Sequence, residues 1–366
     1  MEEIRKTFRA WDAAANATQT FSPASELPED DLVFFLLETI PQLDLEVFYN
    51  QYTETRGAPP FDVDMMCTLL AYSYCVGVFS SRKIAAACER NLAFKAIVGS
   101  DPPDFRTISE AIGRLKEEAR RKADALRQRR EADDAQREAE GQKRRGRTPA
   151  PVSETPEDKA QTNFTDPDAH IMKRSNKGFD DCDNAQAVVD EANQIIVGAE
   201  ATVEANDKKQ AVPMVEATLE TIEQAGIDWP TEDDAPDAAP KSVPISMDSG
   251  YFSEQAVGEL RALPVDPHIA TGRQKHNTPP SDDGSDEPPA DASVKQRMAH
   301  KLRTPEGRAC YAKRKHIVEP VFGQMKHVRG FRQFLLRGLN NVRAEWKLIC
   351  LTHNLLKIWR HQCALT

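Results

Sequence analysis

The sequence lacks the features that mark membrane and secreted proteins. It contains no run of about 18 apolar residues, so we expect no membrane-spanning helix and no membrane partner. It opens with Met-Glu-Glu-Ile-Arg-Lys, which offers no apolar signal-peptide core. The seven cysteines form no Cys-x-x-Cys pair and are odd in number. We therefore expect reduced thiols in the cytoplasm, and neither disulfides nor a structural zinc site.

Acidic residues outnumber basic ones along the whole chain, and this at first disfavours a nucleic-acid partner. The formal net charge is −10, from 48 Lys/Arg and 58 Asp/Glu. Residues 294–366, however, hold 16 of the basic residues and only three of the acidic ones. This asymmetry indicates a surface for phosphate backbones near the C-terminal end, with a solvated basic helix face as the alternative.

The length of 366 residues allows two domains, and the N-terminal part has a helical pattern. Apolar residues recur at spacings of three and four in Leu32, Phe35, Leu36 and Ile40. Asp62 or Asp64 is expected to cap a later helix. We predict a helical domain over residues 1–109, compatible with a helix-turn-helix arrangement.

A charged segment follows over residues 110–160. It begins with a helical stretch holding 13 Lys/Arg and nine Asp/Glu as far as Arg147, and continues as a linker. Such a polar helix is solvated, bridges two parts or dimerises, so a homodimer is one of the expected states.

Residues 161–366 change character, because short strands alternate with helices there. We predict a hairpin from strands 185–190 and 194–199, a helix over 211–225, and strands over 242–248 and 267–272. An acidic low-complexity loop at 277–293 and helices at 307–328 and 341–359 complete this part. The rhythm predicts an α/β fold with some parallel pairing.

Two acidic residues in this part are candidates for chemistry. Asp248 ends a predicted strand, at the edge where α/β proteins bind ligands, although it could simply close a turn. Glu319 shares a predicted helix face with Lys315 and Lys326. It could be a metal ligand in a phosphate-binding surface or an ordinary ion-pair partner. Pro320 is expected to kink or restart the helix beside it.

The motifs around these acids resemble those of a known family. The run Glu319-Pro-Val-Phe-Gly-Gln-Met-Lys326, with Tyr311 before it and Arg-Gly-Phe-Arg332 after it, is similar to the C-terminal signature of bacterial insertion-sequence DDE transposases. Asp248-Ser-Gly-Tyr251 is similar to their second catalytic block. Pro-Asp-Phe-Arg-Thr-Ile-Ser109 is similar to part of their helical N-terminal domain.

The resemblance implies a ribonuclease H-like catalytic core behind a helical DNA-binding domain, in a protein associated with the nucleoid. Asp248 and Glu319 would be two of three carboxylates that hold Mg²⁺ or Mn²⁺ for phosphodiester transfer. Tyr251 would line the site. The DNA, at terminal inverted repeats and target sites, would be contacted by Tyr311, Arg314, Lys315, Lys326, Arg329 and Arg332, and in the N-terminal domain by Arg82 and Lys83.

The sequence departs from the family at one point. The expected strand reading Leu-Asp-Gly-Thr is absent, because Ser109 leads directly into the charged segment. This implies an internal deletion that removed the first strand and the first catalytic aspartate. Asp166, Asp168 and Asp190 are candidate substitutes. Three interpretations stay open: an active transposase, an inactive remnant that binds DNA, and a helical interaction protein unrelated to DNA.

Overall fold

The computed structural model describes residues 9–11, 22–52, 59–113, 170–173, 179–230, 241–272, 288 and 291–365. The chain forms two compact units, one of Met1–His170 with Gln333–Thr366 and one of Ile171–Arg332. Most of the predicted charged segment at 110–160, most of the acidic loop at 277–293, and both Asp166 and Asp168 lie outside the described residues. Among the helices that are described, none is long and apolar enough to cross a membrane.

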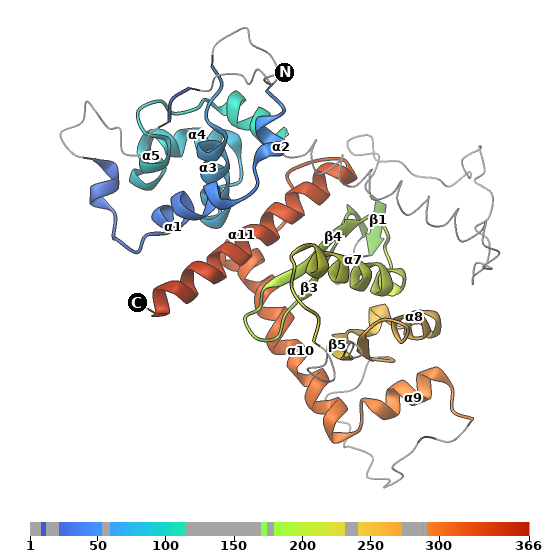
Figure 1. Cartoon of the computed structure of the whole chain (residues 1–366). Coiled ribbons are helices and arrows are strands. Elements are labelled where there is room, and N and C mark those ends of the chain that lie inside the picture. Colours follow the sequence, from blue (N-terminus) through green and yellow to red (C-terminus); the bar gives the residue numbers. More distant parts are fainter. Residues whose placement is uncertain are drawn as a thin grey trace, which may run out of the picture. The chain divides into compact units, whose positions relative to one another are not determined.

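The first unit is helical, as Figure 1 shows in blue to teal and, for its last helix, in red. Asp62 caps one of its helices by accepting a hydrogen bond from the backbone N–H of Met65, which settles the choice between Asp62 and Asp64. The unit contains η1 (Pro23–Glu26), α1 (Leu32–Thr39), η2 (Ile40–Gln42), α2 (Glu46–Tyr49), α3 (Val63–Cys75), α4 (Ser81–Arg90), α5 (Leu92–Val98), a helical stretch at 105–113, and α11 (Leu339–Leu365).

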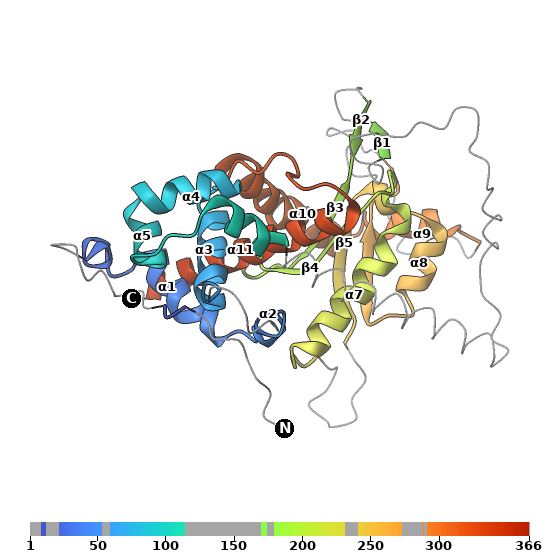
Figure 2. The ribbon, with the colours of Figure 1, turned by 90° about the horizontal axis from the view of Figure 1, so that it is seen from above.

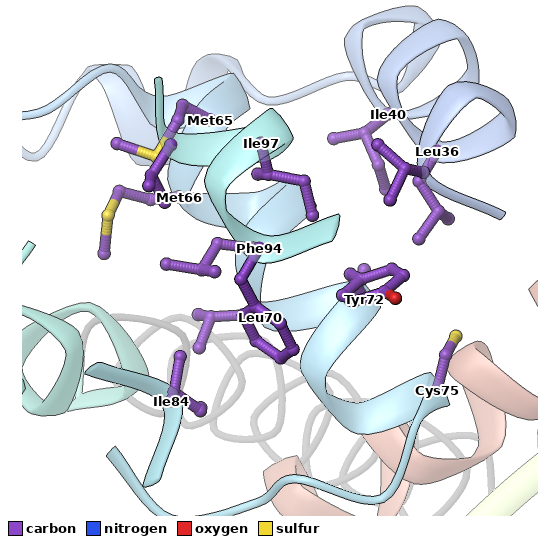
Figure 3. Close-up of a cluster of buried hydrophobic side chains, with 14 of the residues drawn as sticks. Leu36, Ile40, Met65, Met66, Leu70, Tyr72, Cys75, Ile84, Phe94 and Ile97 are labelled. Carbon is purple, nitrogen blue, oxygen red and sulfur yellow. The ribbon is translucent and has the colours of Figure 1, made fainter. Parts of the chain in front are cut away.

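The core of this unit forms around α3, which is buried along nearly its whole length. Side chains from α1, α3, α4 and α5 converge there, among them Leu36, Leu70, Ile84 and Phe94 (Figure 3). The apolar face of α11 joins the same cluster through Leu355 and Leu356, among others. Residues 333–366, which the sequence groups with the α/β part, therefore cluster with the helical unit, because the buried face of α11 packs against α3.

The second unit mixes strands and helices (Figure 2). Its described strands form three separate pairs: β1 with β2, β3 with β4, and β5 with β6. Its elements are β1 (His170–Lys173), β2 (Phe179–Cys182), β3 (Asn184–Val189), β4 (Ile196–Thr202), η3 (Asp207–Lys209), α7 (Ala211–Gln224), β5 (Val243–Met247), η4 (Ser249–Tyr251), α8 (Glu254–Leu260), β6 (Val265–Ile269), α9 (Val294–Lys301), α10 (Pro305–Gly323) and the π-helix η5 (Gln324–Val328).

The predicted mixture of strands and helices behind a helical N-terminal region is confirmed. β3 and β4 form the expected antiparallel hairpin, with Ala187 opposite Ala199. β5 and β6 pair in parallel, with Ile245 opposite Pro267, and β6 begins two residues earlier than predicted. The helix expected at 211–225 is α7.

The expectation that the helix restarts at Pro320 is wrong, because α10 runs through this residue without a break. A proline supplies no backbone N–H to the carbonyl four residues earlier, here that of His316. That carbonyl accepts a hydrogen bond from the Gln194 side-chain Nε2 at 2.7 Å instead. The hairpin turn therefore satisfies the acceptor that Pro320 leaves open, and the helix continues.

Candidate functional site

Asp248 follows the last residue of β5 and is the N-cap of the short helix η4. Its Oδ1 accepts a hydrogen bond from the backbone N–H of Gly250 at 2.7 Å. The side chain is exposed. Asp248 thus combines the two positions considered from the sequence, the carboxyl end of a strand and the closing residue of a turn.

A second carboxylate, that of Asp207, lies beside Asp248. Oxygens of both side chains are 3.0 Å from the point that a Cβ on Gly250 would occupy. The two carboxylates are therefore within twice that distance of each other, and the glycine gives them room. Asp207 is held in place because its Oδ1 accepts hydrogen bonds from Asn184 Nδ2 at 2.6 Å and Gln186 Nε2 at 2.9 Å.

Tyr251, the last residue of η4, lies near the carboxylates of Asp207 and Asp248. Its hydroxyl donates a hydrogen bond to the Oε1 atom of Gln186. Burial raises the pKa of Tyr251 well above its ordinary value, and the negative charges of Asp207 and Asp248 raise it further. The hydroxyl therefore stays protonated at neutral pH and acts as a donor next to two carboxylates.

Glu319 lies exposed on α10, one helical turn after the exposed Lys315. Among the described residues, no three His, Cys, Asp or Glu side chains come close enough together to hold a metal ion. Asp190 serves the hairpin turn, where its carboxylate accepts hydrogen bonds from the backbone N–H groups of Asn193 and Ile195. The carboxylates in the described part of the chain thus fit a three-carboxylate metal centre only in part.

The basic residues of the second unit that are candidates for DNA contact differ in their exposure to solvent. Lys315, Lys326 and Arg332 are exposed; we call these three residues the basic helical surface. The Lys326 ammonium lies 5.2 Å from the centre of the Phe322 ring. Arg332 contacts the Nδ1 atom of His327 at 3.1 Å.

Two other arginines of the second unit are withdrawn from solvent. Arg329 is buried. Arg314 is half-buried, and its guanidinium carbon lies 5.5 Å from the centre of the Tyr311 ring. In the first unit, Arg82 and Lys83 are both exposed on α4, and Arg82 lies against the Phe105 ring at 5.5 Å. A DNA-contacting role for these residues stays a prediction.

Sequence reasoning missed Asp207 and the room that Gly250 gives it beside Asp248. Asp207 lies in the polar connection between β4 and α7, where an acid before a helix is ordinarily a capping residue. The sequence did contain one signal, the glycine two residues after Asp248. A glycine beside a candidate carboxylate leaves room for a second group to approach.

Two stretches of the chain match family models. Residues 21–114 match a transposase domain (DUF772), and residues 288–359 match a transposase DDE domain. The first stretch covers the helices of the first unit from η1 to the helical stretch at 105–113, and the second runs from α9 into α11. No curated protein and no solved structure matches the chain.

Proposed function

Because its two ends match transposase domains, the chain belongs to the DDE transposases of insertion sequences, and on that premise we propose that it binds DNA through the basic helical surface and cleaves it slowly. DNA is the substrate of this family, and its members generally use divalent metal ions. Terminal inverted repeats and target DNA are the expected partners, with Mg²⁺ or Mn²⁺ as the expected ion.

The observation that carries the proposal is the exposure of Lys315, Lys326 and Arg332 on α10, on η5 and just after it. Exposed cations along one part of the chain can each neutralise a phosphate and release a condensed counterion, which drives binding without reading the sequence of the DNA. Glu319 lies between two of these cations along the chain. We therefore propose that the DNA backbone passes over this part of α10.

Slow cleavage is proposed from the arrangement of the acids. Asp248 and Glu319 are the proposed metal ligands, and a ribonuclease H-like core is the proposed setting. Asp207 is the neighbouring carboxylate that Gly250 admits beside Asp248. Since no three acidic side chains gather in the described part of the chain, the donors fit a two-ion centre only in part. A protein that binds DNA and does not cleave it at all is the alternative.

The test uses the full chain with labelled duplexes that carry or lack the terminal repeats of the element. We expect an affinity that falls steeply with salt, and slow cleavage in Mg²⁺ or Mn²⁺ that Asp248→Asn abolishes. Asp291→Asn is the matched control, because Asp291 is also an exposed acid of the second unit.

The outcomes separate the parts of the proposal. Absence of duplex binding at low salt would overturn the DNA-binding role. Cleavage that survives Asp248→Asn would overturn the assignment of the site. Binding without any cleavage would select the alternative.

A further inference from the structure

The second unit contains a cavity of about 600 Å³ that is lined largely by apolar side chains. Two strands and two helices, β3, β5, α7 and α10, form most of its walls, and the segment 227–230 after α7 completes them. From α7 it receives Val215 and Leu219, and from α10 it receives Ile317 and Val318. The four elements bound a space between two strands that belong to different pairs.

The cavity lies against the edges of β3 and β5, not against their faces. Successive side chains of a strand point to opposite faces, so a cavity against one face would touch every second residue. Here the cavity touches every residue from 185 to 189 of β3 and every residue from 243 to 247 of β5. From the outer strands β4 and β6 it touches only Val197 and Val265. The edges of β3 and β5 therefore face each other across the cavity.

The hydrogen bonds between β5 and β6 show which backbone groups of β5 point away from β6. The Val243 N–H donates to Pro264 O, and Met247 O accepts from the Ala270 N–H, so the odd-numbered residues of β5 turn their backbone groups toward β6. The even-numbered residues turn theirs the other way. Ser246 thus presents an N–H and a carbonyl on the cavity side, whereas Pro244 presents a carbonyl alone. No strand in the described part of the chain pairs with that edge.

β3 and β5 run in opposite directions. Gln186, near the start of β3, contacts Tyr251, which follows the end of β5. A strand placed between them would therefore pair in parallel with one and antiparallel with the other, and both patterns satisfy backbone groups. With helices above and below, its side chains would be buried on both faces, which calls for a continuous apolar run.

We propose that this cavity is an acceptor slot for one extended peptide strand that another polypeptide supplies. The strand has about five apolar residues, to match β5, and runs parallel to β5, so that its last residue lies next to Asp248. A second observation also points to a ligand. Arg314 lines the slot, and its Nε is buried with no hydrogen-bond acceptor among the described residues. A carbonyl or carboxylate of the incoming strand would supply one. The proposal does not depend on DNA cleavage.

The test measures binding of a fluorescent peptide with the apolar run Val-Leu-Val-Ile-Ala between lysines, by anisotropy with the full chain. We expect saturable binding and a raised unfolding temperature. The same peptide with a central proline, and one with the run reversed, should each bind at least tenfold more weakly. Ser246→Pro removes the N–H that faces the slot and should weaken binding to a similar extent. Ser246→Ala keeps that N–H and should bind as the unaltered chain does.

A folding defect in Ser246→Pro would not decide the matter, so Val318→Trp provides a second variant. It narrows the slot from α10 and leaves the residues of both strands unaltered, and it should also reduce binding. Equal binding of the proline-containing peptide would show an apolar ligand pocket and overturn strand pairing. Self-association of the chain that the peptide does not displace would assign the slot to a second copy and overturn the proposed occupant. Either result leaves the DNA-binding test above unaffected.

Discussion

The basic helical surface makes a quantitative prediction about salt. Replacing Lys315, Lys326 and Arg332 with glutamine removes three exposed cations and disturbs no buried contact. Each phosphate contact on B-DNA contributes roughly 0.9 to the slope of log affinity against log salt, so losing three should flatten that slope by about 2.7. Over a fourfold rise in salt, the unaltered chain should lose about 40-fold more affinity than the triple variant.

The assay is anisotropy of a labelled duplex titrated with protein between about 50 and 200 mM salt, the range in which such slopes are usually compared. The control is a second triple variant of the same unit, with Lys241, Arg261 and Lys295 each replaced by glutamine. These three are also exposed, so the control has the same change in net charge at other places. Equal slopes in the two triple variants would refute a localised phosphate surface and leave only a general effect of charge.

Three further predictions concern stability. Glu345 is buried and accepts hydrogen bonds from two backbone N–H groups ahead of α11, so Glu345→Ala should cost about 3 kcal/mol in a denaturant titration, and Glu345→Gln less. Burial and the neighbouring Lys301 lower the pKa of His268, so below pH 6.5 the unfolded chain binds a proton more readily than the folded chain does. The free energy of unfolding should therefore fall as the pH drops below 6.5, and His268→Asn should make it depend less on pH. Gln194→Ala should lower the free energy of unfolding of the second unit by about 1 kcal/mol, because the His316 carbonyl loses its hydrogen bond. In a double-mutant cycle, Gln194→Ala should cost much less when Pro320→Ala is also present, because the new backbone N–H at position 320 donates to the same His316 carbonyl.

The elements that the sequence predicts well are those whose signal is local. The β3–β4 hairpin shows this, because its two apolar runs flank a polar turn that Asp190 closes with its own side chain. The position of Asp248 at the end of a strand is equally local, since it needs only the apolar run before it and the small residues after it. The position of Glu319 on a helix is local in the same way, and its role as a metal ligand stays a prediction.

The contacts that could not be predicted join residues far apart along the chain. The acceptor that Pro320 leaves open is satisfied by Gln194, 122 residues before His316, so no rule about proline in helices foretells the unbroken α10. Asp207 stands next to Asp248 only because β3 and β5 run in opposite directions and Gly250 lacks a side chain. A sequence pattern shows that an acid follows a strand, but not which other acid the fold brings to it.

The last helix shows why a continuous motif need not be a structural unit. The DDE-domain match at 288–359 begins in the second unit, through α9, α10 and η5, and continues along most of α11 in the first. Both parts have apolar residues at helical spacing, and that spacing shows only that a face is buried. It does not show which core buries it, and in α11 Leu355 and Leu356 pack into the cluster around α3. The change in composition near residue 160 marks the end of the helical N-terminal sequence. It does not indicate that α11, which begins some 180 residues later, packs into the same core.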